Sequence, residues 1–256
     1  MRLNTYAWGD PESPLVVCLH GVQAYGGRFR RLAEERLARR FRVVAPDLRG
    51  HGQSSWERPW TLATHVDDVL DTVESPACWI GHSFGGRLVA EIMVRRPQLV
   101  ERAVLLDPAL IVPADYAALL AEEELADDVS FATPEEAIET TYANLARPPA
   151  PGVLDEEISE HLVQGDDGRF RHRYSREAVA AAYLELAELP SPWWHSGLPT
   201  LMIAGMESKF VSIGEVAAYT QGLGDRLKVE VVPGGHGVLR EAFEETAAAI
   251  DAFLER

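Results

Sequence analysis

Short apolar segments alternate with amphipathic segments along most of this chain of 256 residues. The apolar segments are rich in β-branched residues and are bounded by turn residues, which is typical of buried strands; they cover residues 15–19, 41–45, 77–80, 103–106, 200–204 and 228–232. The segments between them repeat apolar residues at helical spacing; they cover residues 28–40, 62–73, 86–95, 211–223 and 240–254. This alternation predicts an α/β fold with a mostly parallel, twisted sheet that is flanked by helices.

Residues 113–192 interrupt the alternation. They are rich in Ala, Leu and Glu, contain no convincing buried strand, and are divided by two runs of turn-forming residues at 148–152 and 165–168. Several short helices joined by turns are the economical interpretation. We therefore predict an all-helical cap (lid) at 113–192, inserted between the two parts of one core domain, 1–112 and 193–256.

The charge of the chain is concentrated in the same segment. Overall, 24 Lys and Arg stand against 40 Asp and Glu, a formal charge of −16. Residues 1–112 have 14 basic and 13 acidic side chains (+1), residues 113–192 have 5 and 18 (−13), and residues 193–256 have 5 and 9 (−4). Nucleic-acid affinity comes largely from Lys and Arg that neutralise phosphates, so we expect no nucleic-acid partner. Seven arginines lie between 28 and 42, where a solvated helix is expected.

Cysteine usage and hydropathy bear on the compartment. The two cysteines, Cys18 and Cys78, fall within predicted buried strands and are expected to be free thiols. Cys and His do not occur at zinc-ligand spacing, and no apolar run approaches the roughly 18 residues that cross a bilayer. The first residues lack the apolar stretch of a signal peptide. We expect a cytoplasmic protein without a bound metal and without membrane insertion.

The most informative segment is 78–86, where an apolar run is followed by the sequence GHSFG at 81–85 and then by a helical pattern. In a Gly-x-Ser-x-Gly sequence between a strand and a helix, the serine occupies a tight, strained turn, and the glycines remove side chains that would clash there. The serine then projects above the sheet, beside a helix amino-terminus that favours negative charge. Ser83 is therefore the candidate nucleophile.

With this motif and three others, the chain resembles the α/β-hydrolase fold superfamily, in particular serine esterases and lipases with a helical cap. A His-Gly turn follows the first strong strand at 19–21, a D-x-x-G-x-G-x-S loop lies at 47–54, and a glycine-flanked histidine follows the last strand at 234–237. The four matches occur in the family's order, and the resemblance covers 13–112 and 197–256. It implies a serine hydrolase that needs no cofactor.

The resemblance also implies roles for residues outside the serine turn. A serine hydroxyl needs a base whose pKa lies near the working pH, and His236, in the glycine-flanked loop, is the candidate. His82 directly precedes Ser83 and is expected to pack beneath the turn. The backbone N–H groups of Val22 and Phe84 are expected to form the oxyanion hole. The other histidines are expected to fix loops or to lie at ordinary surface or cap positions; they are His20, His51, His65, His161, His172 and His195.

The acidic member of the triad is ambiguous in this sequence. Most relatives place it in a Gly-x-x-Asp turn after the strand that returns from the cap, but here the third residue after Gly205 is Ser208. Glu207, one position earlier, is one candidate. The other is Asp107, which follows the strand after the nucleophile helix, 24 residues beyond Ser83, as in some small esterases and dehalogenases of this superfamily. We favour Asp107 and keep Glu207 as the alternative acid.

A serine nucleophile excludes the dehalogenase and epoxide-hydrolase chemistries of the superfamily, which use aspartate. The resemblance therefore implies hydrolysis of a small to medium carboxylic ester, a small-molecule substrate, through an acyl-enzyme, by a monomer or a homodimer. Lactone, thioester or carbon–carbon bond hydrolysis on the same machinery is an alternative, and a ligand-binding receptor without turnover is another. The acidic cap favours a neutral or cationic acyl compound.

Overall fold

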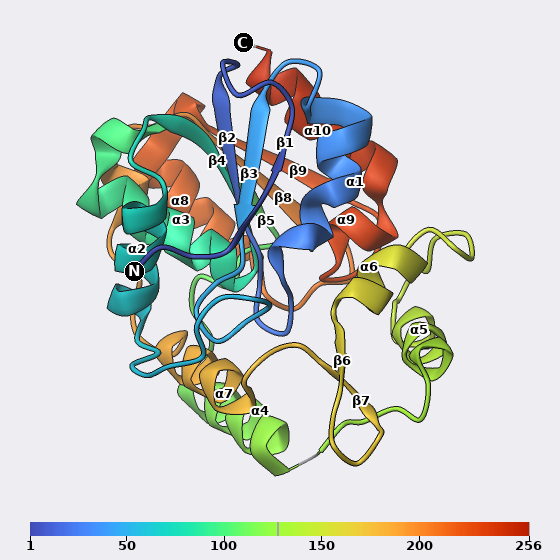
Figure 1. The fold of residues 1–256 in the computed structure, drawn as a ribbon. Coiled ribbons are helices and arrows are strands. Elements are labelled where there is room, and N and C mark those ends of the chain that lie inside the picture. The colour runs from blue at the N-terminus through green and yellow to red at the C-terminus, as the bar shows by residue number, and fades with distance from the viewer. Residues whose placement is uncertain (127, 256) are drawn as a thin grey trace.

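The computed structural model describes residues 1–126 and 128–255, and one large sheet organises most of them (Figure 1). Within this described part, seven strands lie in the order β1-β3-β2-β4-β5-β8-β9. All neighbours pair in parallel except β1, which is antiparallel to β3. The predicted α/β fold with a mostly parallel sheet is confirmed. The strands are β1 (Thr5–Trp8), β2 (Leu15–Leu19), β3 (Arg42–Pro46), β4 (Ala77–His82), β5 (Val100–Leu106), β8 (Thr200–Gly205) and β9 (Leu227–Val232).

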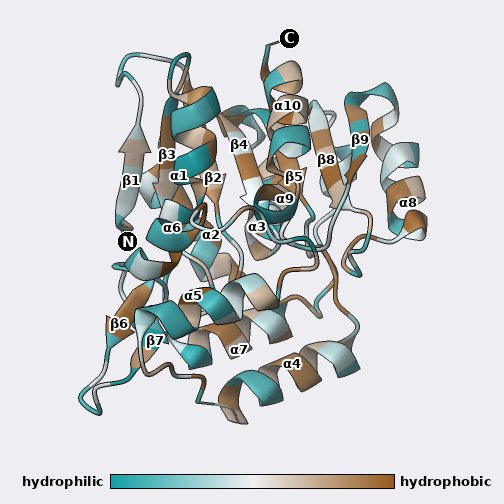
Figure 2. Ribbon diagram, turned by 90° about the vertical axis from the view of Figure 1, so that its right-hand side faces the viewer, coloured by the Kyte–Doolittle hydropathy of each residue, from teal (hydrophilic) through white to brown (hydrophobic). Residues whose placement is uncertain are grey.

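Helices cover both faces of the sheet (Figures 1 and 2). One face carries α2 (Leu62–Thr72), α3 (Phe84–Arg95) and α8 (Ile213–Leu223); the other carries the 3-10 turn η1 (Gly26–Phe29), α1 (Arg30–Leu32), the π turn η2 (Ala33–Leu37), α9 (Val238–Glu241) and α10 (Phe243–Leu254). Successive strand residues point to opposite faces. Val17 accordingly packs in the core beneath α2 and α3, whereas Val16 packs in the core beneath α1 and α10. A strand buried on both faces is apolar throughout, which makes it recognisable in the sequence.

The segment between β5 and β8 lies beyond the carboxyl ends of the parallel strands (Figures 1 and 2). β6 and β7 in this segment pair antiparallel as a hairpin, so the expectation of an all-helical segment is wrong. The run of turn residues at 165–168 lets the chain reverse between them, with Gly168 in the left-handed region at φ +77°. The elements are α4 (Ala114–Ala126), α5 (Pro134–Ala143), α6 (Asp155–Glu160), β6 (Leu162–Gln164), β7 (Phe170–His172) and α7 (Arg176–Glu185).

Two predicted helices are less regular than expected. The segment predicted as one helix at 28–40 is built from η1, α1 and η2, and the segment at 240–254 is divided into α9 and α10 at Ala242, whose φ is −142°. Strand β1 has no counterpart among the predicted strands, because it is short and its side chains are only half-buried or exposed. Short 3-10 turns complete the described elements; they are η3 (Pro97–Leu99), η4 (Trp193–His195) and η5 (Gly224–Arg226).

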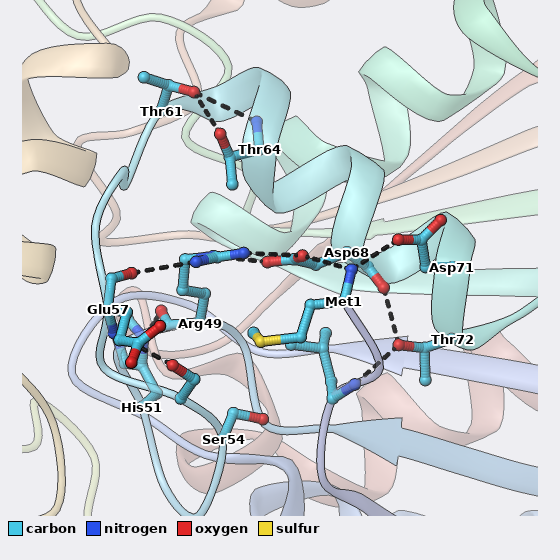
Figure 3. A network of polar contacts seen from close by, with 12 residues as sticks. Met1, Arg49, His51, Ser54, Glu57, Thr61, Thr64, Asp68, Asp71 and Thr72 are labelled. Carbon is cyan, nitrogen blue, oxygen red and sulfur yellow. Dashed lines mark hydrogen bonds and ion pairs between the residues drawn. The ribbon is translucent and has the colours of Figure 1, made fainter.

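The D-x-x-G-x-G-x-S loop at 47–54 is held by its own side chains. Asp47 is buried, and its carboxylate accepts hydrogen bonds from two backbone N–H groups at 2.8 and 2.9 Å. Arg49 extends from the loop toward α2, where it pairs with Asp68 at 2.6 Å, and Asp68 also binds the Met1 amino group (Figure 3). These contacts fix the conformation of the loop, and they pair its charged side chains, Asp47 and Arg49, with other groups of the protein.

Cys18 in β2 and Cys78 in β4 are free, buried thiols, as predicted. The two strands are neighbours, but their register sets Cys18 opposite Ile80 and Cys78 opposite Val16. In the described ranges, no helix combines the length and the apolar character that are needed to cross a membrane.

Arg87 connects helix α3 to both ends of the segment between β5 and β8. Its side chain is 2% exposed and pairs with Glu91 at 3.0 Å. The same guanidinium donates to the carbonyl oxygens of Leu110 (2.5 Å), Glu188 (3.0 Å) and Leu189 (3.1 Å). One buried cation thus satisfies carbonyl groups of the two chain segments that enter and leave this region, which holds both against α3.

We expect Arg87→Met to lower the free energy of unfolding by about 3–5 kcal/mol, because it leaves the Glu91 carboxylate buried without its partner. Urea denaturation followed by circular dichroism measures this loss. Arg95→Met on the same helix is the matched control, since the Arg95 side chain is 35% exposed and pairs with Asp67 at the surface. Its cost should stay below about 1 kcal/mol. Equal losses in the two variants would contradict a special role for the buried arginine.

Candidate active site

Ser83 occupies the tight turn between β4 and α3. Its backbone has φ +53° and ψ −118°, a conformation that residues with a side chain rarely adopt. Glycines on both sides permit it: a Cβ at Gly85 would lie 2.1 Å from the Leu19 carbonyl oxygen, and one at Gly81 would lie 2.4 Å from the Gly85 carbonyl oxygen. The Ser83 N–H donates to the Leu106 carbonyl oxygen at 3.1 Å, which ties the turn to the adjacent strand β5.

His236 and Asp107 meet at the carboxyl ends of the strands. His236 lies on the loop between β9 and α9, and Asp107 directly follows β5. The Nδ1 atom of His236 lies 2.6 Å from Oδ2 of Asp107. The Asp107 side chain is fully buried, whereas the imidazole is 33% exposed. A buried carboxylate at Nδ1 holds the ring in the tautomer whose Nε2 is free to accept a proton.

Neighbouring groups hold this pair from both sides. The Gly205 N–H and the Ser208 hydroxyl donate to the Asp107 carboxylate at 3.0 and 2.5 Å. The carboxylate of Glu241 in α9 accepts hydrogen bonds from the backbone N–H groups on either side of His236, at 2.9 and 3.0 Å. The position of the imidazole relative to the carboxylate is therefore set by two strand ends and by the first turn of α9.

Only one of the two candidate acids, Asp107, contacts His236 among the described residues. Glu207 lies exposed in the turn after β8, and its backbone N–H donates to the Gly234 carbonyl oxygen at 2.9 Å. Among the described residues, Asp107 is the only carboxylate that hydrogen-bonds to His236. Ser208, the third residue after Gly205, donates its hydroxyl hydrogen to Asp107. A serine at this position thus complements a carboxylate that comes from the neighbouring strand.

Of the two residues predicted to form the oxyanion hole, one lines the cavity and the other directly follows Ser83. Val22 lines the cavity that Ser83 and His236 also line, and Phe84 is the first residue of α3. The first N–H groups of a helix have no acceptor within that helix, so the Phe84 N–H can serve a ligand. Gln23, directly after Val22, has φ +57° and is a second strained position at this cavity.

His82 precedes Ser83 in the sequence but forms its hydrogen bond with the backbone of His236. Its Nε2–H donates to the His236 carbonyl oxygen at 2.9 Å, and the two ring centroids lie 4.7 Å apart. Burial lowers the pKa of His82 well below its usual value, and the neighbouring His236 lowers it further. A neutral His82 therefore supports the loop of His236 from below.

The cavity has a volume of about 270 Å³. Its wall combines core residues with residues of the segment between β5 and β8, among them Thr141, Ile158 and Tyr183. Within residues 1–126 and 128–255, no group of three His, Cys, Asp or Glu side chains is arranged to hold a metal ion. Ser83 and His236 both line this cavity.

Four further residues of the cavity wall do not stand out in the sequence; they are Arg28, Arg240, His161 and His172. The sequence predicts Arg28 on a solvated helix, because Glu34 and Glu35 interrupt the run of arginines. Other arginines of this run do pair with acids outside the cavity, whereas Arg28 lines it. His161 is buried rather than at a surface position. Only the approach of α6 and β7 to η1 brings these side chains together, and no local motif encodes it.

A further buried histidine packs against the serine turn. His65 of α2 lies edge-on to Phe84, with ring centroids 5.2 Å apart, and not at the ordinary surface or cap position that was expected. Neither ring nitrogen has a hydrogen-bond partner in the described part of the chain. Burial, and then the nearby His51, lower the pKa of His65 to about 3. The folded protein thus keeps this ring neutral far below the pKa of about 6.5 that it has in an unfolded chain.

A family model described as the alpha/beta hydrolase family matches residues 16–249, so the chain belongs to this family. Lipase LipV of Mycobacterium tuberculosis is 30% identical over 98% of this chain and 97% of its own length. The 2-(acetamidomethylene)succinate hydrolase of Mesorhizobium japonicum is 28% identical over 95% of this chain and 89% of its own. A crystal structure of E-2-(acetamidomethylene)succinate hydrolase has a TM-score of 0.87 at 26% identity, over 99% of this chain and 95% of that one. The predicted family and the prediction of an ester-hydrolase type of enzyme are confirmed.

We expect Ser83→Gly to have a free energy of unfolding about 1 kcal/mol higher than that of Ser83→Ala, because glycine adopts a φ of +53° without strain. Alanine keeps the Cβ and the strain while it removes the hydroxyl, so it is the matched control. Thermal and urea denaturation of the two variants measure the difference. A glycine variant that is no more stable than the alanine variant would contradict the strain at this turn.

We expect His65→Phe to weaken the acid sensitivity of the fold. Below a pH of about 6.5 the unfolded chain binds a proton at His65 that the folded protein does not bind until about pH 3, so stability falls as the pH falls through this window. The term amounts to about 2 kcal/mol between pH 7 and pH 5. Urea denaturation at both pH values should show a smaller loss in His65→Phe than in the unmodified protein. Equal losses would contradict a neutral buried ring.

Proposed function

We propose that the chain hydrolyses a small to medium carboxylic ester through an acyl-enzyme on Ser83, with His236 as general base and acid and Asp107 as the residue that orients it. The observation that carries the proposal is the 2.6 Å contact between His236 Nδ1 and Asp107 Oδ2, at the wall of the cavity that Ser83 also lines. An imidazole fixed in this way has Nε2 available for the serine proton.

The reaction proceeds in two halves. In the first, Ser83 Oγ attacks the ester carbonyl carbon while its proton passes to His236 Nε2, and the tetrahedral intermediate then expels the alcohol, which receives that proton. In the second, a water molecule gives a proton to His236 and attacks the acyl carbon, and the carboxylic acid leaves as Ser83 recovers its proton. Asp107 stabilises the imidazolium that forms in each half without itself becoming protonated.

The negative charge that develops on the carbonyl oxygen requires donors that are already in place. We assign this role to the backbone N–H groups of Val22 and Phe84, the second of which is the first group of α3. One such donor contributes about 3–4 kcal/mol to transition-state stabilisation. Because both are backbone groups, they need no side-chain movement to meet the oxyanion.

The alternative functions are supported to different degrees. Lactones, thioesters and carbon–carbon bonds use the same serine machinery, and the similarity to a protein named a lipase favours an ester among them. The argument for a receptor without turnover is that the turn at 205–208 has no aspartate to pair with His236. Asp107 provides such a carboxylate from another strand, which weakens this argument.

We further propose that residues 113–192 act as a lid over Ser83, since Thr141, Ile158 and Tyr183 of this segment contribute to the cavity wall. Residues 1–112 and 193–256 then form the catalytic core. A cytoplasmic monomer or homodimer stays a prediction, drawn from the two free cysteines and from the resemblance.

We expect Asp107→Asn to lower kcat for p-nitrophenyl butyrate by about 10³- to 10⁴-fold, because the amide no longer holds His236 in the productive tautomer. Steady-state kinetics at pH 7.5 measure the loss. The matched variant Glu207→Gln should stay within about twofold of the unmodified protein, since Glu207 is exposed and does not contact His236.

Covalent labelling separates loss of catalysis from loss of fold. A fluorophosphonate should label the unmodified protein at Ser83, and Ser83→Ala should show neither labelling nor turnover. Labelling without turnover would favour a receptor. Loss of activity in Glu207→Gln with activity retained in Asp107→Asn would overturn the assignment of the acid.

A further inference from the structure

The cavity that contains Ser83 and His236 is also lined by two arginines, Arg28 from η1 and Arg240 from α9. Both guanidinium groups bind the same carboxylate oxygen, Oε1 of Glu157 in α6: Nε of Arg28 lies 3.2 Å away, and Nη2 of Arg240 also contacts it. Two cations therefore share one anion, and the cluster has a net charge of +1. An ion pair with a purely structural role balances its charges, because an uncompensated buried charge is costly.

Polar atoms around this cluster lack protein partners. Within the described part of the chain, Arg240 Nε, both ring nitrogens of His161 and Nδ1 of His172 are buried without a hydrogen bond. His161 is 3% exposed and lines the cavity. Its ring stacks between Tyr25 and His172, with centroid distances of 4.7 and 5.2 Å, which fixes its orientation. Buried polar atoms in native proteins are nearly always hydrogen-bonded, so this set indicates a ligand that completes it.

The charges at this cavity are of one sign at neutral pH. Burial, and then Arg240, lower the pKa of Arg28 to about 10, which leaves the guanidinium charged. Burial also lowers the pKa of His172 to about 4, so this ring acts as a neutral hydrogen-bonding group. Among the described residues, no carboxylate lines the cavity.

The described acidic side chains of the segment at 113–192, including Glu157, which pairs with the two arginines, lie outside the cavity wall. Glu123, Glu124 and Asp128 line a neighbouring hollow of about 580 Å³, and many others face solvent. Among the described residues that line the cavity, Arg28 and Arg240 are the only ones with a permanent charge, although the whole chain has a formal charge of −16.

We propose that Arg28 and Arg240 bind a carboxylate group of the substrate, so that the enzyme acts on esters that carry a second, free carboxylate, such as half-esters of dicarboxylic acids. The inference rests on the proposed function of Ser83. Guanidinium groups match carboxylate geometry with paired N–H donors, and the rings of His161 and His172 provide further hydrogen-bonding groups. This specificity departs from the neutral or cationic compound that the acidic segment favours, because net charge along a segment does not report which side chains face its cavity.

Matched pairs of esters test the proposal. The first pair is p-nitrophenyl hydrogen glutarate and p-nitrophenyl hexanoate, whose acyl groups have equal length when the terminal carboxylate oxygen is counted. The second pair is 3-butyryloxybenzoate, which has the carboxylate on its leaving group, and the neutral phenyl butyrate. In at least one pair, kcat/KM should be about tenfold or more higher for the anionic ester. A preference for the neutral ester in both pairs would overturn the proposal.

Substitutions test which side chains give the preference. Arg28→Gln and Arg240→Gln should each lower the ratio of anionic to neutral kcat/KM by about 10- to 100-fold, because a hydrogen-bonded ion pair with the substrate is lost. Glu157→Gln should raise this ratio, since it removes the competing anion. Arg36→Gln is the matched control, because Arg36 pairs with Glu244 outside the cavity. Equal losses for both esters in the cavity variants would assign them a structural role only.

Binding without turnover keeps this inference separate from the proposed function. In Ser83→Ala protein, glutarate should raise the melting temperature and dimethyl glutarate should not, and adding Arg28→Gln or Arg240→Gln should abolish the shift. Should the unmodified protein hydrolyse none of the esters, the proposed function fails while glutarate binding still decides the carboxylate site. Absence of any glutarate-dependent shift would overturn the carboxylate site.

Discussion

Parallel strand pairing determines where Ser83 and Asp107 lie. His82 is paired opposite Leu106, and Leu106 opposite Ile203, so three strands end at one level. The pattern continues beyond the strands, since the Ser83 N–H donates to the Leu106 carbonyl oxygen and the Asp107 N–H to that of Ile203. Ser83 and Asp107 thus emerge side by side at the carboxyl edge of the sheet, where ligand sites of open α/β sheets form.

Close backbone contacts then bring the histidine loop to this edge. A Cβ at Gly205, the last residue of β8, would lie 2.0 Å from the Gly235 carbonyl oxygen, so the loop packs directly on the strand end. The Gly205 N–H donates to the Asp107 carboxylate at 3.0 Å. Ser208 adds the second donor. The turn after β8 thus supplies two hydrogen-bond donors to the carboxylate that follows the adjacent strand β5.

The sheet was largely predictable, because a strand that is buried on both faces must be apolar at every position; β2 has the predicted bounds, Leu15–Leu19. Strand β1 was not predictable, since its exposed edge imposes no such pattern. The hairpin of β6 and β7 escaped notice for a related reason: most of its side chains are half-buried or exposed, and only the glycine-rich turn between them leaves a trace in the sequence.

The sequence by itself determined the strand–turn–helix around Ser83 and the position of His236 after the last strand, because glycines at fixed spacing and apolar periodicity are local requirements of the backbone. It left Asp107 and Glu207 as alternatives, and only the tertiary structure placed one of them against the imidazole. The same holds for Arg28 and Arg240, which are 212 positions apart in the sequence and share one carboxylate. Contacts between distant segments depend on how the whole chain packs, and no local pattern records them.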